Sequence, residues 1–98
     1  MLTKEEVATR LKASAYPRVT EESIKEKVAS VRFVNEDTTV ICIIEMKNGF
    51  KFIGHSTPAD EGNYDEEIGE FYAYENTFKQ IWPLEGYLLR DKLSSNKN

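Results

Sequence analysis

The feature that most constrains the fold is an Asn48-Gly49 pair between two apolar segments. Both central residues of a type I′ hairpin turn need a positive φ, which Asn and Gly adopt at little cost. The pair therefore predicts a β-hairpin that joins a strand from Thr38 to Lys47 with a strand from Phe50 to His55.

As a two-residue loop, this turn pairs Lys47 with Phe50 and fixes the register of the hairpin. The other pairs of this register are Glu45 with Phe52, Ile44 with Ile53, and Cys42 with His55. One face then carries Ile41, Ile43, Phe50 and Phe52, and the other carries Val40, Cys42, Ile44, Met46 and Ile53. Both faces are apolar, whereas an antiparallel sheet with one wet face alternates. We therefore expect helices on both faces or a second chain on one, and a homodimer is the predicted state.

Two short helices are expected before the hairpin. Thr3 and Glu6 form a capping-box pattern that predicts the start of the first helix. Thr20 predicts the start of the second helix. The pattern changes to alternation in Val31-Arg32-Phe33, which predicts a strand from about Ala29 to Asn35. The three strands form an antiparallel meander.

A long helix follows the meander. Asn63 is expected to cap it, with Glu66 in the capping-box position. Its apolar stripe, which is expected to pack on the sheet with Trp82 as a core anchor, contains Ile68, Phe71, Phe78 and Trp82. Pro83 either kinks this helix or opens a new one, and the helical pattern continues to about Leu93. The fold class is therefore α+β: short N-terminal helices, a three-stranded antiparallel meander and a long Pro-kinked C-terminal helix on the sheet.

Length and composition fit a single domain over residues 1–98 with a polar tail from about residue 94. The net charge of −4 disfavours nucleic-acid binding, which needs a basic surface. Cys42 is the single cysteine of the sequence, which excludes an intrachain disulfide and is typical of a reducing compartment. Without a signal-peptide pattern or a long apolar run, the protein is expected to be cytoplasmic and to lack a membrane partner.

Three motifs carry a resemblance to a known family. They are Lys47-Asn48-Gly49-Phe50, Asp65-Glu66-Glu67-Ile68-Gly69 and Ile81-Trp82-Pro83-Leu84-Glu85-Gly86-Tyr87. On these residues the C-terminal two-thirds of the chain resembles the small tailed-phage and prophage proteins named for gene product 49 of one podovirus and gene 66 of another. The resemblance implies phage origin and residence in the bacterial host cytoplasm. It implies no reaction, substrate or ligand.

The motif residues are interpreted as folding residues. Asn48 and Gly49 form the turn, and Gly69 allows close approach to the long helix at some cost in helix propensity. Pro83 and Gly86 shape the bend near the end of the helix.

No catalytic or metal site is predicted. Cys42 and His55 would make a possible nucleophile and base, but no third residue orients them, so we expect no enzyme activity. The acidic stretch from Asp60 to Glu70 has the wrong spacing for an EF-hand and suits a solvated helix start. One Cys and one His cannot make a structural zinc site, so no cofactor is expected.

Glu75 is the most informative polar residue, because it projects into the apolar stripe. An acid in such a place must pair, protonate or line a cavity. With its aromatic neighbours it gives four candidate binding residues, which are Glu75, Tyr74, Trp82 and Tyr87.

The leading functional hypothesis is a non-enzymatic phage accessory protein that binds a host protein, for example an inhibitor of a host defence or replication protein. The alternative is a small-molecule-sequestering protein whose ligand is a nucleotide signal. A DNA-transaction accessory module is a third hypothesis, which the net charge disfavours.

Overall fold

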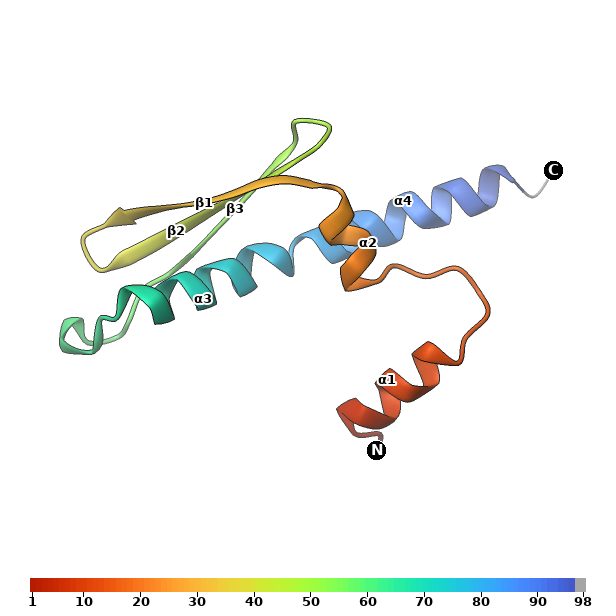
Figure 1. The fold of residues 1–98 in the computed structure, drawn as a ribbon, viewed down its shortest axis with the longest axis horizontal. Helices are drawn as coiled ribbons and strands as arrows, with labels where there is room; N and C mark the ends of the chain where they lie inside the picture. Colours follow the sequence, from red (N-terminus) through yellow and green to blue (C-terminus); the bar gives the residue numbers. More distant parts are fainter. Residues whose placement is uncertain (97–98) are drawn as a thin grey trace.

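The structure is a computed structural model that describes residues 1–96. Its elements in chain order are α1 (Lys4–Lys12), α2 (Glu21–Glu26), β1 (Val28–Glu36), β2 (Thr39–Met46), β3 (Lys51–Ser56), the 3₁₀ turn η1 (Glu61–Asn63), α3 (Glu66–Phe78) and α4 (Ile81–Ser95). The strands form one antiparallel sheet in the order β1-β2-β3, with α3 along one face (Figure 1). The predicted α+β architecture is confirmed.

The helix starts follow the chemistry of side-chain caps. Thr3 and Glu6 form the predicted capping box of α1, and Thr20 caps α2. The predicted cap of the long helix is wrong, because Asp65, not Asn63, accepts the backbone N–H groups of Glu67 and Ile68. The Asp65 carboxylate accepts two free N–H groups, and its negative charge is favourable at the positive end of the helix.

The hairpin register differs from the predicted one by one residue. Met46 N–H donates to the carbonyl of Phe50 at 2.8 Å, so the loop has three residues, Lys47 to Gly49. Gly49 has a φ of 90°, as such a loop needs at its last position. The observed pairs are Glu45 with Lys51, Ile44 with Phe52, Ile43 with Ile53, Cys42 with Gly54, and Ile41 with His55.

This slip exchanges Phe52 and Ile53 between the two faces of the sheet, because strand side chains alternate. Phe52 joins the buried face toward α3, where it is 8% exposed, while Ile53 is 59% exposed on the opposite face. The buried face carries Val40, Cys42, Ile44, Met46 and Phe52. The opposite face, which carries Ile41, Ile43 and Ile53, is left open by residues 1–96 (Figure 1).

Small side chains of α3 face the sheet. Ala73 and Thr77 are fully buried, and Gly69 lies one turn before them on the same side of the helix. A Cβ on Gly69 would lie 2.6 Å from Val40 Cγ2. On strand β3, a Cβ on Gly54 would lie 2.9 Å from the backbone nitrogen of Thr77. The helix therefore lies closer to the strands than it could with larger residues, which confirms the predicted role of Gly69.

Side-chain amides of Asn76 on α3 and of Gln80, the residue before α4, also bind the edge of the sheet. Asn76 donates its Nδ2 to the carbonyl of His55 at 3.0 Å, and Gln80 donates its Nε2 to the carbonyl of Ile53 at 2.9 Å. Backbone carbonyls at the outer edge of β3 thus have partners without a further strand.

The predicted packing of the large apolar stripe is wrong for most of its members. Phe78 is buried, but Ile68 is 56% exposed, Phe71 is 55% exposed and Trp82 is 38% exposed. Because Gly69, Ala73 and Thr77 occupy the sheet-facing side of α3, Ile68 and Phe71 lie on its far side, while Trp82 belongs to the first turn of α4. Trp82 packs edge-on against Phe78, with ring centroids 6.4 Å apart, and is not a buried core anchor.

The helix break comes before Pro83. Helix α3 ends at Phe78, and α4 begins at Ile81 with Pro83 in its first turn. The backbone N–H at that position has no partner within a helix, so proline costs nothing there. Of the two alternatives for Pro83, the structure shows the one in which it opens a new helix. Ser94 and Ser95 belong to α4, so the predicted tail from residue 94 is too long, and its last two residues lie outside the described part.

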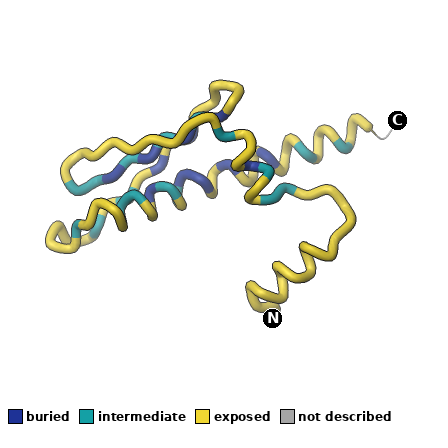
Figure 2. The backbone as a smooth tube through the Cα atoms, viewed as in Figure 1, coloured by how far each residue is buried: buried dark blue, intermediate teal, exposed yellow. Residues whose placement is uncertain are grey.

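The molecule is extended. Its radius of gyration is 16.8 Å, whereas a compact chain of this length has about 13 Å. Helix α1 has no buried residue and lies away from the sheet (Figures 1 and 2). The buried residues gather where β2, β3 and α2 meet α3 and the start of α4 (Figure 2).

Gly54→Ala is expected to destabilise the fold by about 1–3 kcal/mol, because the new methyl group meets the backbone of Thr77, which cannot move aside alone. Gly86→Ala is the matched control. Nothing lies within 4 Å of a Cβ at Gly86, so alanine there should stabilise α4 by about 0.5–1 kcal/mol. Urea unfolding of both variants measures the two effects. Equal stability of the two variants would contradict the close contact of α3 with β3.

Candidate binding cleft

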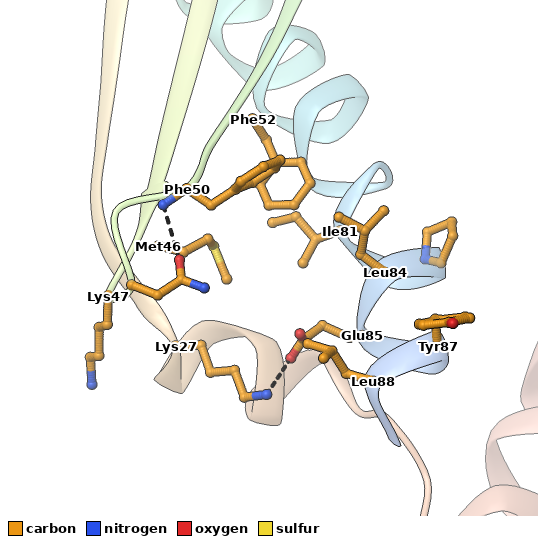
Figure 3. A pocket seen from close by; sticks show the side chains of 12 residues that line it. Lys27, Met46, Lys47, Phe50, Phe52, Ile81, Leu84, Glu85, Tyr87 and Leu88 are labelled. Atoms are coloured by element: carbon orange, nitrogen blue, oxygen red, sulfur yellow. Dashed lines mark hydrogen bonds and ion pairs between the residues drawn. The ribbon is translucent and has the colours of Figure 1, made fainter. Parts of the chain in front are cut away.

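A cleft of about 750 Å³ opens between the hairpin turn, the end of α2 and the first turns of α4 (Figure 3). Met46, Phe52 and Ile81 are buried beneath it and form its floor. Its exposed apolar walls are Phe50, Leu84, Tyr87 and Leu88. Concave, mainly apolar surfaces with a few polar groups are typical of binding sites.

The hairpin turn positions Phe50 at the edge of the cleft. Asn48 Oδ1 accepts the backbone N–H of Phe50 at 3.0 Å, which holds the residue after the turn in place. The Phe50 ring packs edge-on against Phe52, with centroids 5.1 Å apart, and remains 55% exposed. The turn thus presents one aromatic ring to solvent and buries the next.

Helix α4 supplies the opposite wall. Leu84 and Leu88 lie four residues apart, so they share one side of the helix. Leu84 is 46% exposed and Leu88 is 54% exposed. Tyr87 is 75% exposed at the rim (Figure 3). These exposed apolar side chains would lose contact with water if a ligand filled the cleft.

A salt bridge crosses the base of the cleft. Lys27 Nζ lies 2.6 Å from Glu85 Oε1, which links the end of α2 to α4 (Figure 3). The Glu85 side chain is 10% exposed and the Lys27 side chain is 55% exposed. Because the buried partner is the carboxylate, the lysine compensates a charge that water hardly reaches.

The structure places one of the four predicted binding residues in the cleft, namely Tyr87. Tyr74 and Trp82 pack on two sides of Phe78, and Glu75 is exposed on α3. Glu75 is therefore not an acid confined among apolar side chains, because the stripe that surrounds it faces solvent. Burial raises the pKa of Tyr74, which packs against the core.

The predicted Cys42–His55 pair is not formed. Cys42 lies opposite Gly54, and His55 lies opposite Ile41 with its side chain on the other face of the sheet. Cys42 is fully buried, and burial raises the pKa of its thiol, against a smaller lowering by a hydrogen bond from Thr77. A protonated thiol is a poor nucleophile.

Three of the six acids between Asp60 and Glu70 accept hydrogen bonds that support the fold. Asp60 accepts the N–H of Gly62, Asp65 caps α3, and Glu66 accepts the side-chain amide of Asn35 at 2.9 Å. Within residues 1–96, no group of three His, Cys, Asp or Glu side chains is placed to hold a metal ion. The helices of this part are also too short or too polar to cross a membrane.

Sequence reasoning missed most of the cleft. Lys27, Phe50, Leu84 and Leu88 were not predicted as binding residues. The run from Leu84 to Leu88 carries a usable signal, since it follows Pro83 with two leucines at helical spacing. The contribution of Lys27 depends on the tertiary contact with Glu85 and leaves no local pattern.

The family comparison agrees with the motif resemblance. A model of the family described as "Phage protein (N4 Gp49/phage Sf6 gene 66) family" matches residues 2–93. The chain belongs to this phage protein family. The match extends beyond the C-terminal two-thirds in which the motifs lie, and it includes α1, α2 and β1. No curated protein and no solved structure gives a significant match.

In this phage protein, removal of the Lys27 side chain should destabilise the fold, because the Glu85 carboxylate is then buried without a partner of opposite charge. We expect Lys27→Met to lower the free energy of unfolding by about 1–3 kcal/mol, because a largely buried charge loses its partner. The control is Lys25→Met, which breaks the exposed pair with Glu21 and should cost no more than about 0.5 kcal/mol. Thermal and urea unfolding compare the variants. Equal losses would show that the Lys27–Glu85 pair is no more than a surface ion pair.

Cys42 should resist alkylation in the native protein. Its burial and raised pKa leave little reactive thiolate at neutral pH. Iodoacetamide labelling followed by mass spectrometry should be slow in buffer and fast in denaturant, which serves as the control. Rapid labelling of the folded protein would mean that the sheet opens at this strand.

Proposed function

We propose that the protein is a non-enzymatic phage accessory protein that binds a host protein through the cleft. The observation that carries the proposal is the pair of apolar walls, Phe50 on one side and Leu84 with Leu88 on the other, above a buried apolar floor. Exposed apolar patches of this kind are a mark of interaction sites.

The chemistry of the cleft favours a polypeptide segment with apolar side chains. A few buried side chains, often aromatic, contribute most of the binding energy at protein interfaces, and a polar rim surrounds them. Here Tyr87 offers a hydroxyl at the rim, and Lys47 adds a positive charge beside the turn. A segment with two apolar anchors and an acid near one end would complement both features.

The nucleotide alternative has weaker support in the cleft. Phosphate groups are bound by several charged or backbone donors at once. Two lysines line the cleft, and Lys27 is already paired with Glu85. Lys47 alone would then face the phosphates of a ligand, although Phe50 and Tyr87 offer rings for a base.

The family gives the biological context of the proposal. The chain belongs to a phage protein family, and a phage protein that binds without catalysing a reaction can act on its host by occupying a surface that a host protein needs. We therefore propose that the target is a host defence or replication protein, and that binding inhibits it.

The test is affinity capture from host lysate, followed by calorimetry with the purified partner. Leu88→Glu should weaken binding at least tenfold, since it places a charge among the apolar walls, and it should leave the circular dichroism unchanged because Leu88 is exposed. Ile53→Glu is the matched control, with similar exposure on the open face of the sheet, and should bind as the native protein does.

A partner that binds Leu88→Glu as tightly as the native chain would show that the cleft is not the binding site. A thermal-shift panel of nucleotides decides the alternative. If a nucleotide raises the unfolding temperature and Lys47→Ala abolishes that rise, the ligand of the cleft is a nucleotide and not a host protein.

A further inference from the structure

Beyond the cleft, a second apolar surface runs along the side of α3 that faces away from the sheet. We call it the outer stripe, and it consists of Ile68, Phe71 and Tyr72 on α3 together with Trp82 in the first turn of α4. Each of these side chains is between 38% and 56% exposed. Phe71 and Tyr72 pack edge-on with centroids 5.1 Å apart, which makes one aromatic surface. The stripe exists because Gly69, Ala73 and Thr77 occupy the sheet-facing side.

We propose that the outer stripe is the contact surface of a homodimer, in which α3 and the start of α4 pack antiparallel against the same helices of a second copy. The proposal is independent of the cleft, whose walls belong to the hairpin turn and the opposite side of α4. The proposed contact surface also differs from the open apolar face of the sheet, which was the reason for predicting a homodimer from the sequence.

The area of the molecule fits a second copy. Its accessible surface is 7750 Å², about 2,000 Å² more than a compact chain of this mass exposes. A stable dimer needs to bury about 800 Å² on each partner. Part of the excess belongs to α1, which has no buried residue. The outer stripe supplies the large aromatic side chains that anchor such contacts.

The charges on the stripe are self-complementary. Glu75 on α3 and Lys79, the residue that caps the end of this helix, lie four residues apart, and neither forms a salt bridge within residues 1–96. If two copies pack antiparallel about a two-fold axis between these residues, Glu75 faces the partner's Lys79 and Lys79 faces the partner's Glu75. The same register sets Tyr72 beside the partner's Trp82. A two-fold contact needs this kind of self-complementary surface.

Light scattering after size exclusion gives the first test. The native chain should have the mass of two chains, and Phe71→Glu should have the mass of one with an unchanged circular dichroism spectrum. The control Ile53→Glu, at an equally exposed apolar residue on the open sheet face, should remain dimeric. A single-chain mass for the native protein at all concentrations overturns the proposal. Dissociation by Ile53→Glu but not by Phe71→Glu overturns it in favour of the sheet face.

Charge reversal gives the second test and distinguishes contacts between chains from contacts within one chain. Glu75→Lys and Lys79→Glu should each weaken the homodimer at least about tenfold, because like charges then meet twice across the axis. An equal mixture of the two variants should dimerise again, since each lysine now faces a glutamate of the other variant. Within either chain the repulsion remains, so recovery cannot come from inside one molecule. A mixture that stays monomeric overturns the proposed register.

Discussion

The close contact of α3 with β2 and β3 governs the rest of the molecule. Gly69, Ala73 and Thr77 on the helix, together with Gly54 on the sheet, bring the two backbones nearer than larger side chains would allow. A layer this thin has no space for the ring of Phe71, which therefore lies on the far side of α3. The exposed apolar side of α3 is thus a direct result of the small residues at this contact.

The fold was largely predictable because its elements have strong local signals. Alternating apolar residues, the Asn48-Gly49 turn and the threonine caps each act over a few residues and identified the meander and the short helices correctly. The register was not predictable to the residue, since Asn-Gly is compatible with a two-residue loop and with a three-residue loop. That one difference moved Phe52 into the core and Ile53 out of it, and it separated Cys42 from His55.

The candidate site was predictable only at Tyr87. A helical stripe of Ile68, Phe71, Phe78 and Trp82 is ordinarily the buried side of a helix, because burial of large apolar groups is favourable. Here the smaller residues of α3 are buried instead, because Gly54 on the sheet lies opposite Thr77 and leaves room for a close contact. Such complementarity depends on two segments that lie far apart in the sequence, and no local pattern records it. The Lys27–Glu85 bridge depends on the tertiary fold in the same way.

The two edges of the sheet are unequal, and this asymmetry limits how the chain can polymerise. Asn76 and Gln80 occupy the outer carbonyls of β3 with their amides, whereas β1 is the other edge strand of the sheet. A ribbon that grows without end needs two free edges on every unit. Two molecules that paired through their β1 edges would have no free edge left for a third molecule, so growth would stop at a pair. The amides of Asn76 and Gln80 therefore hinder the addition of a further strand at the β3 edge.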